Sequence, residues 1–174
     1  MRNSKVKLEP LTEKHCIFFH EWISDKDAIK YSLSLFQELR NIDWVKNYIR
    51  KINSASTSFS RAIIKTDDQK PIGYCGLVNI SKTNSCAEYF ILIGNKSNWN
   101  KGFGAEAGID VLKVAFMTMG LNRVWLTVSE HNIRAIRSYK KIGYVDEGRM
   151  RQACFRDGKY HDKVVMSILR TEWL

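Results

Sequence analysis

Apolar residues in the first third of the chain recur at helical spacing. Val6 and Leu8 alternate with polar residues before Pro10, which predicts a short first strand. Thr12 precedes an amphipathic stretch with apolar positions three and four residues apart, and a second such helix is expected from Asp43 to Ile52. These stripes are typical of helices that pack one face on a core.

The period then changes to that of strands. Three segments rich in β-branched and aromatic residues follow one another, and polar turn clusters at 66–70 and 81–85 separate them. Short connections favour antiparallel neighbours, so a three-stranded meander is expected. Its strands are predicted from Phe59 to Lys65, from Ile72 to Ile80 and from Ala87 to Ile93.

The second half of the chain predicts further helices and strands. One helix opens at Gly102-Phe103-Gly104 and ends near Gly120, and another runs from about Asn132 to Lys141. The chain shows no repeat and no linker, so 1–174 is predicted to form one mixed α+β domain. The remaining strands are expected at about 123–128, 144–155 and 160–169, with a turn at Asp157-Gly158 between the last two.

Basic residues outnumber acidic ones, 28 Lys and Arg against 18 Asp and Glu, for a formal charge of +10. This balance favours polyanionic partners: nucleic acid, a membrane surface or phosphorylated small molecules. The basic residues are spread along the chain without a block, which argues against a nucleic-acid-binding tail. We find neither a signal-peptide pattern nor about 18 consecutive apolar residues, so we expect a cytoplasmic protein without membrane association.

The cysteines and histidines lack the spacings of metal sites. No cysteine pair has metal-knuckle or redox-motif spacing, which predicts free thiols in a reducing compartment. The histidines show no metalloprotease or zinc-finger spacing, so no metal is expected. These residues are Cys16, Cys75, Cys86 and Cys154, and His15, His20, His131 and His161.

The segment from Ile91 to Ala107 contains a strand, a polar loop and a glycine-containing turn that leads into a helix. A helix N-terminus presents unpaired backbone N–H groups, and glycines there let a phosphate approach the backbone closely. A tight connection without a ligand is the alternative. A Walker loop is excluded by the missing Gly-Lys-Ser/Thr, and a dinucleotide-binding fold fits poorly because three meander strands come first.

Three motifs stand out along the second half of the chain: Trp99-Asn100-Lys101-Gly102-Phe103-Gly104 with Ala105-Glu106-Ala107, then His131 to Tyr144, then Arg156 to Asp162. Together they resemble the GCN5-related N-acetyltransferase (GNAT) superfamily. The branch they resemble includes ribosomal-protein N-terminal acetyltransferases and relatives that act on amino sugars and polyamines. Trp99 stands where the family's acetyl-CoA loop usually has Gln or Arg, which removes one side-chain contact to phosphate.

The resemblance implies a mostly antiparallel mixed sheet flanked by helices, in the order β-α-α-β-β-β-α-β-α-β-β, and an acetyl-CoA site. Two strands splay apart in this family, and the pantetheine arm lies between them like an added strand. The helix stripe Arg134, Arg137 and Lys141 is either a solvated face or a neighbour of the CoA 3′-phosphate. The implied cofactor-binding residues are Ile91, Leu92, Ile93, Trp99, Asn100, Lys101, Gly102, Phe103, Gly104, Ala105, Asn132 and Tyr139.

Acetyl transfer requires a neutral amine to attack the thioester, and the departing thiolate benefits from a proton donor. Tyr139 matches the family's tyrosine for that donor, with a buried core tyrosine as the alternative. For the base we name Glu88, the only carboxylate in its strand. It shares a face with Phe90 and Leu92, so it either lines the cleft or faces water.

The acceptor amine is the least determined part of the prediction. Between Asp27 and Asp43 the chain offers only Glu38 as a carboxylate, which disfavours a cationic polyamine and favours a nucleotide-linked amino sugar. A protein N-terminus, another small-molecule amine and a polyamine stay open. The non-enzymatic alternative is a basic RNA-associated module, although nucleic acid is not favoured as a partner. Whether the chain forms a homodimer is also open.

Overall fold

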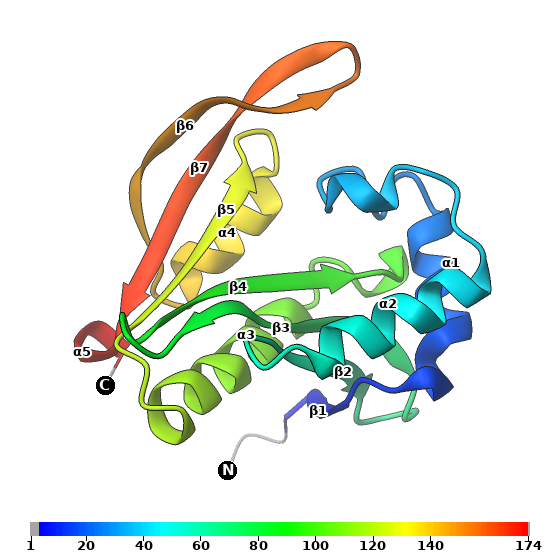
Figure 1. The fold of residues 1–174 in the computed structure, drawn as a ribbon, viewed down its shortest axis with the longest axis horizontal. Helices are drawn as coiled ribbons and strands as arrows, with labels where there is room; N and C mark the ends of the chain where they lie inside the picture. The colour runs from blue at the N-terminus through cyan, green and yellow to red at the C-terminus, as the bar shows by residue number, and fades with distance from the viewer. Residues whose placement is uncertain (1–3, 174) are drawn as a thin grey trace.

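A computed structural model describes residues 4–173 and shows a seven-stranded sheet flanked by helices (Figure 1). The strand order is β1-β2-β3-β4-β5-β7-β6. All neighbouring pairs are antiparallel except β4 and β5, which are parallel. The strands are β1 (Val6–Pro10), β2 (Phe59–Lys65), β3 (Pro71–Ser81), β4 (Cys86–Ile93), β5 (Arg123–Ser129), β6 (Val145–Arg156) and β7 (Lys159–Leu169).

The helices follow the predicted order, with one short addition at the end. The helix opened by Gly102 ends as an α-helix at Lys113 and continues as a π-helical turn, Val114–Thr118, before Gly120. The four-residue α5 was not predicted because one turn has no hydrophobic period. The helices are α1 (Cys16–Ser24), α2 (Ile42–Ser54), α3 (Phe103–Lys113), α4 (Ile133–Lys141) and α5 (Arg170–Trp173). Within residues 4–173, none has the length and apolar character needed to cross a membrane.

Helices cover both faces of the sheet at β2 to β4, and strand alternation assigns each side chain to one of two cores. Ala87 and Tyr89 of β4 join the core under α3, whereas Leu92 joins the core that contains Phe19 of α1 and Ile49 of α2. Full burial of a Leu, Ile or Phe side chain contributes about 1.5–3 kcal/mol to the stability of the fold. These two cores fix the position of β4, which forms one wall of the cleft described below.

The two parallel strands separate after three residue pairs. β4 and β5 pair from Cys86 with Arg123 to Glu88 with Trp125. Beyond that point β4 continues beside β3, while β5 turns away and runs beside β7 (Figure 1). The facing edges of the separated strands leave backbone N–H and C=O groups available for an extended ligand.

Candidate active site

A cleft of about 800 Å³ lies where β4 and β5 diverge. Its walls come from the end of β4, the loop into α3, α4 along its length and the segment between α1 and α2. Of the cofactor-binding residues expected from sequence, all but one line it. These are Ile91, Leu92, Ile93, Trp99, Asn100, Gly102, Phe103, Gly104, Ala105, Asn132 and Tyr139. Lys101 is exposed and does not line the cleft.

The loop into α3 has the backbone conformation of an anion site. Gly102 is the N-cap residue and has φ = 87°, a left-handed conformation that L side chains rarely adopt. No side chain caps the helix, so the N–H groups of its first turn are free to bind an anion. A Cβ on Gly102 would meet no atom within 4 Å, so the backbone conformation, rather than crowding, favours glycine here.

Trp99 anchors this loop and supports a cation. Its indole Nε1 donates to the carbonyl oxygen of Ile93 at 2.8 Å, and the guanidinium of Arg134 lies 3.5 Å from the ring centroid. Partial burial lowers the pKa of Arg134, which still lies far above neutrality for a guanidinium. Arg137 and Lys141 from the same stripe also line the cleft, so this stripe forms part of the wall. Arg134 of α4 therefore places a cation beside position 99.

Asn132 and Tyr139 occupy the α4 wall. The Asn132 side-chain oxygen accepts from the N–H of Ala135 at 3.3 Å and caps the helix. The Tyr139 ring packs against Tyr89 and Tyr144, with centroids 6.2 and 5.8 Å away. Burial raises the pKa of Tyr139 to about 12, so its hydroxyl is protonated at neutral pH and can donate. It is at once a packed residue and a wall residue of the cleft.

Glu88 lies apart from the other candidates. It is the last β4 residue paired with β5, and it is not among the residues that line the cleft. Its carboxylate accepts from the side-chain N–H of Asn79 at 2.8 Å. Strand alternation places it on the opposite face from Ile91 and Ile93. A catalytic role for Glu88 stays a prediction.

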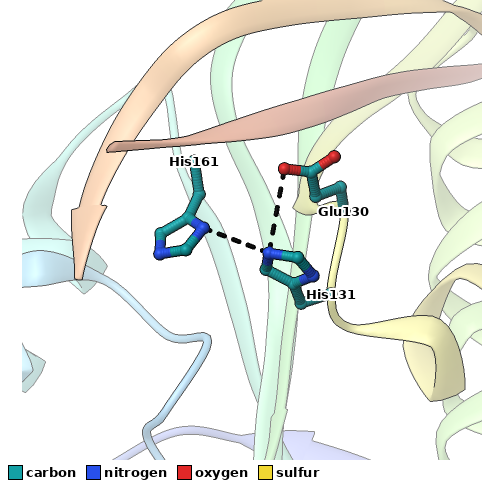
Figure 2. A group of neighbouring side chains, drawn as sticks. All are labelled: Glu130, His131 and His161. Atoms are coloured by element: carbon teal, nitrogen blue, oxygen red, sulfur yellow. Dashed lines mark hydrogen bonds and ion pairs between the residues drawn. The ribbon is translucent and has the colours of Figure 1, made fainter. Parts of the chain in front are cut away.

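One cluster was missed at the sequence level because its members come from different elements. Atoms of Glu130, His131 and His161 that could act as metal ligands lie within 4.8 Å of one another (Figure 2). The Glu130 oxygens are already engaged: Oε2 accepts from Arg149 at 2.7 Å and Oε1 from the N–H of Asp162 at 3.1 Å. A cation would have to displace these bonds, so the geometry favours a hydrogen-bonded cluster. No spacing rule relates His131 to His161, since pairing of β5 with β7 brings them together.

The opposite wall also combines distant segments. Tyr31 and Ser32, between α1 and α2, line the cleft. Arg156 at the tip of the β6–β7 hairpin donates from Nη2 to the Ser32 carbonyl at 2.7 Å, and its guanidinium lies 5.9 Å from the Tyr31 ring centroid. The hairpin thus holds the segment that forms this wall.

Comparison with known proteins identifies the family. The model of the acetyltransferase (GNAT) domain matches residues 5–145. The chain belongs to the GNAT acetyltransferase family. It is an N-acetyltransferase that uses acetyl-CoA, as the three motifs implied, and the family match favours an enzyme over the RNA-associated module.

The similar proteins give the GNAT assignment more detail. A spermidine N(1)-acetyltransferase of Vibrio cholerae is 27% identical over 99% of this chain and 97% of its own. The enzyme of the same name from Escherichia coli K12 is 26% identical, covering 97% and 88%. A solved spermidine N-acetyltransferase of V. cholerae, in complex with CoA and spermine, superposes with a TM-score of 0.88 at 24% identity and covers 98% of this chain and 99% of that one. The predicted fold is confirmed. None of these three is named for a nucleotide-linked amino sugar, so that expectation finds no support here.

Proposed function

We propose that this GNAT enzyme transfers the acetyl group of acetyl-CoA to a primary amine of a small polyamine. The observation that carries the proposal is the likeness over nearly the whole chain to a spermidine N(1)-acetyltransferase. This corrects the ranking drawn from sequence, in which the single carboxylate between Asp27 and Asp43 and the charge of +10 disfavoured a cationic acceptor.

The positions of three cationic side chains answer the argument that the net positive charge disfavours a cationic acceptor. Arg134, Arg137 and Lys141 stand on the α4 wall, on the same cleft as the Gly102 loop. There they fit the phosphates of CoA, with the pyrophosphate at the α3 N-terminus and the 3′-phosphate near the stripe. Positive charge that serves the cofactor says nothing about the acceptor. A net charge is therefore a poor guide to the sign of the second substrate.

The proposed cofactor pose uses mainly backbone groups. The free edge of Ile91, Leu92 and Ile93 would bond the pantetheine arm as a neighbouring strand would, with Asn132 on the opposite side. The thioester then lies near Tyr139. Attack by the neutral amine forms the C–N bond and breaks the C–S bond, and the Tyr139 hydroxyl gives a proton to the departing sulfur.

Thiol release measured over a panel of amines tests the proposal. The panel consists of spermidine, spermine, a nucleotide-linked amino sugar, an aminoglycoside and an N-terminal peptide. We expect the highest kcat/KM with a polyamine, and no release above background hydrolysis without an acceptor. A higher kcat/KM with the amino sugar or the peptide would overturn the polyamine assignment and leave acetyl transfer intact.

A further inference from the structure

Two histidines meet at the end of β5 because the β5–β7 register continues past the last strand residue. Ser129 pairs with Lys163, and the N–H of Glu130 donates to the carbonyl of Asp162 at 3.2 Å. The next step places His131 opposite His161, with His131 Nε2 3.1 Å from His161 Nδ1 (Figure 2). His131 also lines the cleft, so this pair belongs to its wall.

The hydrogen bonds assign the tautomers. His161 Nε2 lies 3.2 Å from the carbonyl oxygen of Arg156. A carbonyl only accepts, so Nε2 carries the hydrogen and His161 Nδ1 holds a lone pair. His131 must then donate from Nε2 to His161, which leaves the lone pair of His131 on Nδ1. That nitrogen lies on the side of the ring away from His161 and Glu130 (Figure 2).

A proton added to Nδ1 of His131 would be stabilised by His161 and Glu130, which lie on the Nε2 side of the ring. The His131 imidazolium would keep its bond to His161, and its Nε2 lies 3.8 Å from Oε1 of Glu130. Glu130 is itself fixed by two hydrogen bonds. In a typical histidine general base, one ring nitrogen is held by a hydrogen-bond acceptor and a nearby carboxylate stabilises the imidazolium. His161 and Glu130 provide these two groups for His131. The charged groups around the pair are Glu130 after β5, Arg149 on β6, Asp162 on β7 and, on the same cleft, Arg134 of α4.

We propose that His131 accepts the proton of the substrate ammonium, with Glu130 and His161 as positioning residues. The inference rests on the proposed acetyl transfer and names its base. His131 Nδ1 takes one proton from the ammonium and passes it to solvent on the exposed side of the ring. The neutral nitrogen attacks the thioester carbon, the C–S bond breaks, and sulfur takes the proton of Tyr139. The second proton lost by nitrogen restores Tyr139.

This assignment competes directly with Glu88. Histidine is the side-chain type best suited to proton transfer at neutral pH. Glu88 lies off the cleft and is held by Asn79, while His131 is part of the wall. Parallel variants at the two positions separate the two bases.

The experiment is a pH profile of thiol release with spermidine and acetyl-CoA for wild type, His131→Gln, Glu130→Gln, Glu88→Gln and His20→Gln. His20 is the matched control, since its Nε2, like that of His131, bonds one acceptor, here the backbone carbonyl of Arg40 at 2.8 Å, and it does not line the cleft. We expect His131→Gln to lower kcat/KM about a hundredfold near pH 7 and to move the acid limb to the higher pH at which the free amine forms, with acetyl-CoA KM unchanged. The loss should shrink as pH rises and free amine accumulates.

Glu130→Gln gives a readout that a merely structural role would not produce. Removal of the negative charge makes the imidazolium less stable, so the acid limb should persist and move to lower pH. A His131→Gln variant with an unchanged acid limb and kcat/KM within twofold of wild type would overturn the proposal, and a shift of the limb to higher pH in Glu88→Gln would assign the base there. A wild type that acetylates no amine of the panel would overturn acetyl transfer itself and this proposal with it.

Discussion

The two sides of the cleft differ in how the chain builds them. The side proposed for the cofactor consists of contiguous segments, the loop from Trp99 to Ala105 and α4. The opposite side joins Ser32 to Arg156, which are 124 positions apart, and His131 to His161, which are 30 apart. A contiguous site leaves a motif in the sequence, whereas a composite site can change its substrate without disturbing any motif. This explains why acetyl-CoA was easier to predict than the acceptor.

On the cofactor side, the largest expected effect is at Tyr139. We expect Tyr139→Phe to lower turnover at least about tenfold with little change in the KM for acetyl-CoA. The ring keeps its packing, and only the hydroxyl that donates to sulfur is lost. Steady-state thiol release measures both parameters.

Tyr144→Phe is the matched control for this prediction. Tyr144 belongs to the same aromatic cluster, its hydroxyl is buried with no hydrogen-bond partner in the described chain, and it does not line the cleft. Its turnover should stay within twofold of wild type. Equal losses in the two variants would show that the cluster acts by packing and would remove Tyr139 from the chemistry.

A smaller effect is expected at Arg134, the cation on Trp99. We expect Arg134→Ala to weaken acetyl-CoA binding about fivefold, because it removes a charge placed for phosphate, and to leave the KM of the amine unchanged. Isothermal titration with acetyl-CoA at two salt concentrations measures the effect. Arg151→Ala, at an exposed position of β6, controls for the loss of one positive charge. The same loss in both variants would mean that overall charge, and not the stacked guanidinium, attracts the cofactor.

Local rules predicted most of the elements, and motifs of adjacent residues carried the resemblance from which the candidate cofactor residues were drawn. A glycine with positive φ, an Asn cap and helical spacing are properties of a few adjacent residues, so Gly102, Asn132 and the α4 stripe could be identified from sequence. The stacking of Arg134 on Trp99 and the meeting of His131 with His161 depend on how α4 packs on the loop and on the β5–β7 register. These are tertiary facts that no spacing encodes. Glu88 shows the limit of local rules: its strand was predicted correctly, but alternation left open whether its side chain lines the cleft or faces water.

The smallest expected effect concerns the attachment of the β6–β7 hairpin to β5, on the side of the cleft that is built from distant segments. Arg123 of β5 forms a two-pronged ion pair with Glu147 of β6, and Ser167 of β7 donates to the same carboxylate at 2.7 Å. The Arg123 guanidinium lowers the pKa of Glu147 from its ordinary value of 4.5 to about 2. A carboxylate whose pKa is lower in the folded state than in the unfolded state stabilises the fold at pH values above its unfolded-state pKa. The contribution of Glu147 is therefore complete at neutral pH and is lost as pH falls from about 4.5 towards 2.

Glu147→Gln tests that attachment. The carboxylate is partly exposed, and solvent screening limits the expected loss to about 1 kcal/mol or less at pH 7. Denaturant unfolding of wild type and variant at pH 7 and below pH 3 should show two midpoints that differ at neutral pH and converge in acid. Because the hairpin holds Ser32 and His131 of the cleft wall through Arg156 and His161, the variant should also raise the KM of the amine more than that of acetyl-CoA. Equal changes in the two KM values would mean that the two sides of the cleft are not independently built.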